Sequence, residues 1–251
     1  MNKIALITGA SRGLGKSMAL ALAKQGVDLV ITYHSKRAEA DAVVSAAQAF
    51  GVKAAALPLD VSDSSSFTHF SAALAAVLAN NWQRERVDFL VNNAGIGIHA
   101  SFAETTEAQF DHLVNIHFKG VFFLTQALLG NINDGGRIIN ISSGLTRFSF
   151  PGYAAYAAMK GAVETLSKYM AKELGARRIT VNTLAPGAIE TDFGGGAVRD
   201  NSELNQMIAR QTALGRVGLP DDIGGVIALL LNDPSGWLNG QRIEASGGIF
   251  L

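Results

Sequence analysis

The sequence contains no cysteine, and this absence excludes disulfides and thiolate metal sites. A chain without cysteines is typical of a reducing compartment, so we expect a cytoplasmic protein. Five histidines are present, but their positions show no metal-ligand spacing, so we expect no metal site. They are His34, His69, His99, His112 and His117.

The sequence also lacks an excess of charge of either sign. Lys and Arg together number 21, Asp and Glu together number 21, and the formal net charge is zero. The broad basic footprint of a nucleic-acid-binding protein is therefore missing. The apolar runs are too short for a signal-peptide core or for a membrane span of roughly 20 residues, so we expect neither nucleic acid nor membrane as partner.

What the chain does contain is a regular alternation of short apolar runs and longer helix-like stretches. The expected strands are Lys3–Thr8, Leu29–Tyr33, Lys53–Leu59, Phe89–Val91, Arg137–Ile141, Thr180–Leu184 and Gln241–Glu244. The expected helices are Lys16–Gln25, Arg37–Phe50, Ser66–Leu78, Gln109–Leu128, Tyr153–Gly175 and Asp222–Asn232. Val, Ile and Leu fill both parities of most strands, as in strands buried on two faces. The alternation predicts an α/β fold, a doubly wound Rossmann-type domain with a seven-stranded parallel sheet flanked by helices.

No repeat, linker or composition shift interrupts this pattern, so we expect one domain over residues 1–251. Helix-capping signals stand at Asp60–Asp63 and at Pro220–Asp222.

The first expected strand runs directly into Thr8-Gly-Ala-Ser-Arg-Gly-Leu-Gly15. Gly9 and Gly13 allow the backbone to turn and approach phosphates, and Gly15 allows the following helix to pack on the sheet. A strand before and a helix after are the context of a diphosphate-binding turn. The alternative is a glycine-rich turn that serves chain geometry only, and the spacing differs from the common G-x-G-x-x-G.

Further motifs follow in order: Asn92-Asn-Ala-Gly95, Tyr156-Ala-Ala-Met-Lys160, Pro186-Gly187, and the glycines near the C-terminal end. Together with the glycine turn they resemble the short-chain dehydrogenase/reductase family over the whole length. The resemblance implies a nicotinamide cofactor and hydride transfer to or from a carbonyl carbon. Carbonyl reductases and 3-oxoacyl-carrier-protein reductases are the similar members.

Tyr156 and Lys160 lie four residues apart in an expected helix and so share one face. A nearby ammonium favours the phenolate, and we expect it to lower the tyrosine pKa from about 10. Tyr153 has no lysine four residues later. The resemblance makes Tyr156 the acid/base, assigns Lys160 to the nicotinamide ribose, and gives Ser143 the substrate oxygen; adjacent Ser142 is the weaker candidate.

One position departs from the family pattern. The family often carries an asparagine about twenty-two residues past the Asn-Asn-Ala-Gly motif, and alignment on Gly95 and Gly120 puts His117 there rather than Asn115. Two interpretations stay open. Either His117 holds a water that links Lys160 to solvent, or it satisfies a helix kink and packs.

The end of the second expected strand indicates which nicotinamide cofactor is used. Tyr33 stands where NAD-dependent relatives carry an acid, while His34, Ser35 and the basic residues after them face the expected 2′-phosphate together with Arg12. We therefore expect NADP(H), with NAD(H) as the alternative. A further alternative is that Lys36 and Arg37 only begin a solvated helix.

The resemblance also implies the remaining cofactor contacts. The full expected set is Gly9, Ser11, Arg12, Gly13, Leu14, Gly15, Tyr33, His34, Ser35, Asp60, Val61, Asn93, Ala94, Gly95, Tyr156, Lys160, Pro186, Gly187, Ile189 and Thr191.

The substrate end is less defined. Three glycines after Phe193 suggest a lid around residues 188–213. The expected pocket residues are Leu145, Phe148, Tyr153, Ile189 and Phe193, all uncharged, and they favour an apolar carbonyl compound.

A 3-oxoacyl-carrier-protein substrate would need clustered basic residues, for which Arg147, Arg199 and Arg210 are the candidates. A non-catalytic dinucleotide sensor, or a lyase or epimerase on the same scaffold, is the remaining alternative. Small residues in helix 153–175 and the resemblance suggest a homotetramer or homodimer.

Overall fold

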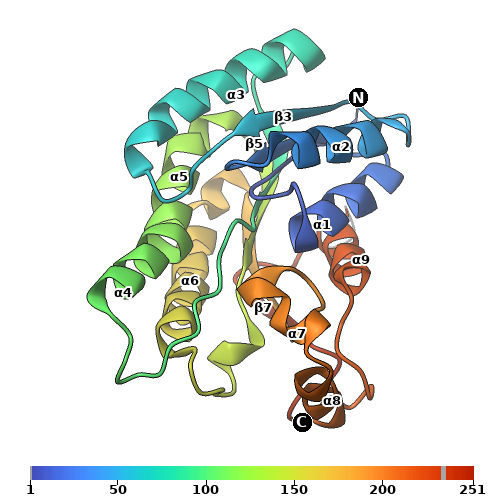
Figure 1. The fold of residues 1–251 in the computed structure, drawn as a ribbon. Helices are drawn as coiled ribbons and strands as arrows, with labels where there is room; N and C mark the ends of the chain where they lie inside the picture. Colours follow the sequence, from blue (N-terminus) through green and yellow to red (C-terminus); the bar gives the residue numbers. More distant parts are fainter. Residues whose placement is uncertain (1, 233–235) are drawn as a thin grey trace.

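The computed structural model describes residues 2–232 and 236–251, and its centre is a single parallel sheet (Figure 1). The strands are β1 (Ile4–Ile7), β2 (Asp28–Tyr33), β3 (Ala54–Pro58), β4 (Val87–Asn92), β5 (Ile132–Ile141), β6 (Thr180–Pro186) and β7 (Arg242–Ala245). Their order is β3-β2-β1-β4-β5-β6-β7, and every neighbouring pair is parallel. All seven expected strands are confirmed. The largest difference is β5, which begins at Ile132 instead of Arg137 because Ile132 pairs with Val87 before a register shift, after which Arg137 pairs with Phe89.

Helices cover both faces of the sheet (Figure 1). One layer contains α1 (Gly13–Lys24), α2 (Arg37–Gln48) and α9 (Pro220–Leu230). The other contains α3 (Phe67–Trp82), α5 (Gly120–Leu128) and α6 (Ala154–Glu173), with α4 (Glu107–Val114) leading into α5.

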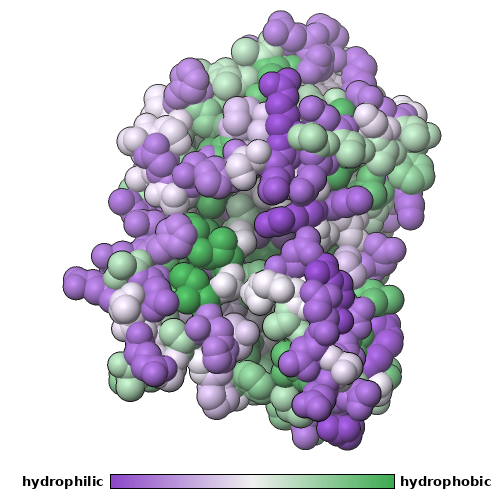
Figure 2. Space-filling model, in the orientation of Figure 1, coloured by the Kyte–Doolittle hydropathy of each residue, from purple (hydrophilic) through white to green (hydrophobic). Residues whose placement is uncertain are grey.

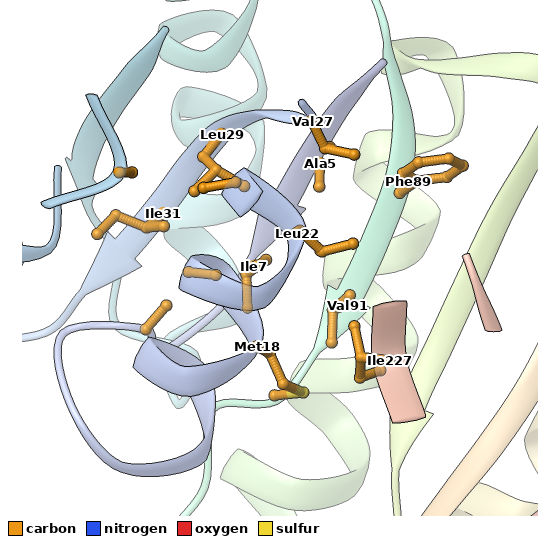
Figure 3. Packing of buried hydrophobic residues seen from close by; sticks show 14 of the residues in the cluster. Ala5, Ile7, Met18, Leu22, Val27, Leu29, Ile31, Phe89, Val91 and Ile227 are labelled. Atoms are coloured by element: carbon orange, nitrogen blue, oxygen red, sulfur yellow. The ribbon is translucent and has the colours of Figure 1, made fainter. Parts of the chain in front are cut away.

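The strand residues divide between these two layers by parity. Ala5 and Ile7 belong to the apolar cluster under α1 and α9, together with Met18 and Leu22 of α1 (Figure 3). Ile4 and Leu6 belong to the cluster under α3 and α5 on the opposite face. Because alternate side chains of a strand point to opposite faces, both parities must be apolar when both faces are covered. This is the pattern that the sequence predicts.

The expected helix Gln109–Leu128 is divided in the structure. α4 ends at Val114, a π-helical turn follows over Asn115–Lys119, and α5 begins at Gly120. Thr106 caps α4, because its side chain accepts from the Gln109 N–H while the Gln109 side chain accepts from the Thr106 N–H. The π turn brings His117 to the buried side of the helix.

The helical run Glu107–Asn131 corrects the expectation that no segment is apolar enough to span a membrane. By length and mean hydropathy it meets that test among the described residues, yet 44% of its apolar part is buried inside the fold. A core helix passes the same test, and α5 contributes Leu124 and Leu128 to the core.

The structure also adds two helices and identifies the capping residues. The segment after β6 contains the helices α7 (Ala197–Asp200) and α8 (Ser202–Arg210), which the sequence analysis did not predict. Asp60 is not the helix cap, because its carboxylate accepts from the Ser62 N–H and hydroxyl, while Asp63 caps the next turn by accepting from the Ser65 N–H. At α9 the capping carboxylate is Asp222, inside the first turn, which accepts from the Leu219 N–H.

Candidate active site

A cavity of about 610 Å³ opens at the carboxyl ends of the strands. Every residue expected to bind cofactor, to carry the chemistry or to face the substrate lines this one cavity. Figure 2 shows the face seen in Figure 1, with hydrophobic surface over the segment between β4 and α4 and mostly hydrophilic surface over α7 and α8. Ligands of doubly wound sheets bind at this edge of the sheet.

The glycine turn between β1 and α1 forms one end of the cavity. A Cβ atom on Gly9, whose φ is +64°, would lie 2.8 Å from the Ala94 Cα, and one on Gly15 would lie 2.5 Å from the Gly9 carbonyl oxygen. The close packing predicted for Gly15 is thus confirmed. α1 begins at Gly13 without a side-chain cap, so its first-turn N–H groups are left for a ligand in the cavity. This cradle fits the diphosphate of a dinucleotide.

The other end of the glycine turn faces β2. Arg12, Tyr33, His34 and Lys36 line the cavity there, and His34 lies 3.5 Å from the Asp60 carboxylate at the end of β3. Arg37 is instead exposed and paired with Asp41 on α2, at 3.6 Å. The sequence analysis left open whether Lys36 and Arg37 face the cofactor or only begin a solvated helix. Lys36 lines the cavity, whereas Arg37 belongs to the solvated start of α2.

Tyr156 and Lys160 lie on α6 near the middle of the cavity, and both are buried. The Lys160 ammonium lies 5.6 Å from the centroid of the Tyr156 ring and donates a hydrogen bond of 2.8 Å to the Ile141 carbonyl at the end of β5. The predicted juxtaposition on one helix face is confirmed.

The electrostatics of this pair differ from the expectation. Burial raises the pKa of Tyr156 well above its ordinary value, and the opposing influence that lowers it comes from a hydrogen bond with Ser143, not from the ammonium. Burial also lowers the pKa of Lys160 to about 7. The lysine is thus close to losing its charge at neutral pH. A partly neutral lysine lowers the pKa of Tyr156 less than the sequence analysis expected.

Ser143 and Ser142 leave the end of β5 in different directions. The Ser143 hydroxyl oxygen accepts from the Leu145 N–H at 3.2 Å, so its proton is free to point toward Tyr156 or a substrate. The Ser142 hydroxyl donates to the Glu164 carboxylate at 2.6 Å and is 2% exposed. The geometry therefore favours Ser143, as expected.

His117 lies against Tyr156. Its ring is edge-on to the Tyr156 ring at 5.1 Å, and a Cβ on Gly95 would lie 2.6 Å from its Cε1. The Nε2 atom lies 2.8 Å from the Ile96 carbonyl oxygen and 3.3 Å from the Ile96 nitrogen, and the shorter contact favours the tautomer with its proton on Nε2. The buried Nδ1 atom has no hydrogen-bond partner in the described residues. Burial, and next the charge of Lys160, hold the pKa of His117 well below its ordinary value. The histidine is neutral at physiological pH.

Aromatic rings pack beside the Tyr156 ring in the cavity. The ring centroid of Phe193 lies 5.5 Å from that of Tyr156, and the centroid of Tyr153 lies 6.4 Å from it. Phe150 continues the cavity wall at 6.3 Å from Tyr153, and His99 packs behind Tyr153 at 5.2 Å without lining the cavity. These distances are typical of edge-to-face and tilted ring contacts. Phe193 is 42% exposed, so an apolar ring face is left for a ligand.

The sequence analysis missed several residues of this wall. Phe150, Leu204, Met207, Ile208, Ile249 and Phe250 also line the cavity. The α8 residues had a signal, because positions 204, 207 and 208 follow the i, i+3, i+4 spacing of one helix face. No local pattern identifies the C-terminal Ile249 and Phe250.

Comparison with known proteins agrees with this geometry. A family model described as Enoyl-(Acyl carrier protein) reductase matches residues 9–249. A tetrahydroxynaphthalene reductase of Pestalotiopsis fici is 35% identical over 98% of this chain and 91% of its own. The chain belongs to the short-chain dehydrogenase/reductase family. It is an NAD(P)-dependent oxidoreductase, as the similar members are.

Two solved structures of the family are closely similar to this reductase. The promiscuous reductase LugOII, which catalyses keto-reduction at C1 during lugdunomycin biosynthesis, superposes with a TM-score of 0.94 at 37% identity, covering 99% of this chain and 98% of that one. The angucycline C-6 ketoreductase LanV, solved with bound NADP, gives a TM-score of 0.93 at 33% identity, covering 99% and 95%. Both proteins are ketoreductases, and LanV binds NADP, so these similarities support NADP-dependent carbonyl reduction for this chain.

Proposed function

We propose that this protein is an NADPH-dependent reductase of flat aromatic ketones, with Tyr156 as the proton donor. The observation that carries the proposal is the set of aromatic rings that line the cavity beside Tyr156, together with the diphosphate cradle formed by the glycine turn in the same cavity. Relatives that act on hydroxynaphthalene and angucycline ketones support it.

The chemistry needs a hydride on the carbonyl carbon and a proton on the carbonyl oxygen. A bound NADPH supplies the hydride and becomes oxidised, and the ketone becomes a secondary alcohol. Tyr156 donates its hydroxyl proton to the oxygen, which suits a tyrosine whose pKa is held high enough to keep it protonated at neutral pH. Ser143 donates a hydrogen bond to the same oxygen as negative charge develops on it.

Lys160 and His117 both contact the Tyr156 ring and assist this proton transfer without contacting the substrate. Lys160 lies over the Tyr156 ring and holds the nicotinamide ribose, and its pKa of about 7 lets it gain and lose a proton near neutral pH. His117 offers a bare Nδ1 to a buried water, through which Lys160 exchanges its proton with solvent.

The preference for NADPH rests on the end of β2. Arg12 and Lys36 line the cavity beside Tyr33, which stands where a carboxylate would bind the ribose hydroxyls of NADH. The remaining expected contacts, from Ser11 to Thr191, line the same cavity and complete the cofactor site. Relatives solved with bound NADP support the same preference.

A carrier-protein-bound 3-oxoacyl substrate is the competing function. Two of the three arginines that would attract the acidic carrier are engaged elsewhere: Arg147 binds the Glu244 carboxylate, and Arg199 pairs with Asp192 and Asp200. The substrate wall itself is aromatic and aliphatic. These observations favour a neutral aromatic ketone over an acyl thioester.

The test is NADPH oxidation by the purified protein with three acceptors. They are a bicyclic aromatic ketone of the tetralone type, an acyclic aliphatic ketone with the same number of carbons, and a 3-oxoacyl thioester. We expect kcat/KM to be highest for the bicyclic ketone, with Tyr156→Phe abolishing its turnover while NADPH still binds. Highest activity with the thioester would contradict the substrate class, and turnover by Tyr156→Phe would contradict the mechanism.

The assembly and the lid belong to the same proposal. Residues 188–213 act as a lid over the substrate within a single domain, with Gly194, Gly195 and Gly196, all at positive φ, as its hinge. The protein is a cytoplasmic homotetramer or homodimer that pairs through α6, which has small residues such as Ala154 and Gly161.

A further inference from the structure

Ser143 lies in a turn that is fastened at both ends by carboxylates. The turn runs over residues 142–147, between the end of β5 and the start of the aromatic wall. Glu164 on α6 accepts from the Ser142 hydroxyl at the start of the turn, at 2.6 Å, and from the Thr146 hydroxyl near its end, at 2.7 Å. At its end, Arg147 makes two hydrogen bonds, of 2.8 and 2.7 Å, to the Glu244 carboxylate on β7.

Arg242 joins the two carboxylates. Its Nε donates to Glu164 at 2.8 Å, its Nη1 donates to Glu244 at 2.9 Å, and its Nη2 lies 3.3 Å from the Ser143 carbonyl oxygen. Arg242 and Glu244 are two apart on β7, so both point to the same side of the strand. The result is an alternating series, Glu164, Arg242, Glu244 and Arg147, in which positive and negative charges balance.

Glu164, Arg242 and Glu244 are largely removed from solvent, whereas the Arg147 side chain at the end of the series is 36% exposed. The side chains of Glu164 and Arg242 are 16% and 24% exposed. A charge-assisted hydrogen bond between such groups is stronger than one in water, and removing one partner leaves the other buried without compensation. These hydrogen bonds therefore restrict the movement of the turn that contains Ser143.

Glu164 is also tied to the rest of the catalytic group through α6. It lies one turn after Lys160 and two turns after Tyr156 on the same helix, so it moves with them. A single carboxylate thus sets the position of the serine turn relative to the helix that carries the tyrosine.

We propose that Glu164, with Arg242, is a positioning pair that holds Ser143 at hydrogen-bonding distance from Tyr156 and the substrate oxygen. Neither residue touches the reacting atoms. This inference rests on the proposed function, because it assigns a role only if Ser143 serves the reaction.

The test is a double-mutant cycle with single-turnover hydride transfer as the readout. Glu164→Ala, Ser143→Ala and the double variant are mixed, bound to NADPH, with the bicyclic ketone, and the absorbance of NADPH is followed. We expect Glu164→Ala to slow transfer on the order of ten- to a hundredfold, the range that follows from misplacing a catalytic group by about 1 Å. In the Ser143→Ala background the same change should slow transfer less than about twofold, since the group that it positions is gone.

Two controls separate positioning from general damage. The dissociation constant of NADPH should stay within about twofold of wild type in Glu164→Ala, because the network does not touch the cofactor residues. Asp134→Ala removes an ion pair with Arg177 far from the site and should leave transfer unchanged. Should Glu164→Ala fail to fold, Glu164→Gln, which keeps an acceptor oxygen but not the charge, enters the same cycle with a smaller expected loss.

The outcomes distinguish the two proposals. If Ser143→Ala transfers hydride at the wild-type rate, the proposed role of Ser143 is wrong. If Ser143→Ala is slow and Glu164→Ala is not, or if the two losses simply multiply in the double variant, Glu164 does not act through Ser143 and the inference is overturned.

Discussion

At the scale of single residues, burial decides the chemistry of the catalytic pair. A tyrosine and a lysine one helical turn apart suggest an ammonium that lowers the phenol pKa, yet both side chains are almost fully enclosed. Desolvation disfavours the charged form of each group, so the tyrosine stays protonated and the lysine approaches neutrality. For a reductase this is the useful direction, because the tyrosine must begin the reaction with its proton.

The low pKa of Lys160 predicts how stability depends on pH. Burial lowers it from 10.5 to about 7, so between these values the unfolded chain binds a proton that the folded chain does not. The free energy of unfolding therefore increases as pH rises from about 7 to 10.5. Below about pH 7 the folded state bears the full cost of burying the charged ammonium. The Tm advantage of Lys160→Met over wild type, measured without cofactor, should be largest near pH 7 and shrink toward pH 10. An advantage that stays constant over that range would contradict the assignment.

A second prediction concerns Arg12 and Tyr33. Combining Arg12→Ala with Tyr33→Asp removes a cation for the 2′-phosphate and introduces an acceptor for ribose hydroxyls. The ratio of kcat/KM with NADPH to that with NADH should fall roughly ten- to a hundredfold, the worth of a charge-assisted hydrogen bond. Arg37→Ala is the matched control, since Arg37 pairs with Asp41 outside the cavity. An unchanged ratio in the double variant would count against the NADPH preference.

At the scale of elements, the π turn between α4 and α5 places His117. A π turn contains more residues than a regular α turn, so it changes the direction in which the side chains after α4 point compared with an uninterrupted α-helix. The turn instead brings the ring against Tyr156 and within hydrogen-bonding distance of Ile96, in the segment that leaves β4. One side chain thereby connects α6, which carries Tyr156, to the loop after β4.

His117→Ala should therefore reduce turnover by about tenfold or more and change its pH profile, because both the clamp on Ile96 and the acceptor Nδ1 are lost. His117→Asn, the residue that the family often carries at this position, should retain most of the activity. The measurement is kcat against pH for the three proteins. Equal profiles for wild type and His117→Ala would eliminate the proton relay.

At the scale of the whole molecule, the substrate wall is assembled from distant parts of the chain. Phe250 packs on Phe148 at 4.8 Å, and its N–H donates to the Gln211 carbonyl just after α8. Arg147 donates to the Ile249 and Phe250 carbonyls, which brings the C-terminal segment to the serine turn. The wall is thus a tertiary feature shared by the lid, the serine turn and the last residues.

Phe250→Ala should raise KM for the bicyclic ketone several-fold while the KM for NADPH stays unchanged, because Phe250 lies at the substrate end of the cavity and buries apolar surface there. Trp237→Ala is a matched control, since this aromatic side chain is 99% exposed. Steady-state kinetics with each substrate varied in turn makes the comparison. Parallel rises in both KM values would indicate a general loss of structure instead.

The sequence by itself determined the parallel sheet and the glycine turn, and it predicted that Ser143, Tyr156 and Lys160 share one site, where the structure brings them together in one cavity. The sheet, the turn and the pairing of Tyr156 with Lys160 follow from strand parity, glycine geometry and helical spacing, which are short-range properties of neighbouring residues, whereas Ser143 was predicted from the family resemblance. Only the tertiary structure decided the pKa directions, the aromatic wall with Phe250, and the series from Glu164 to Arg147. Burial and long-range pairing depend on which distant segments meet, and no local pattern in β7 or α6 indicates that Arg242 and Glu164 will share a hydrogen bond.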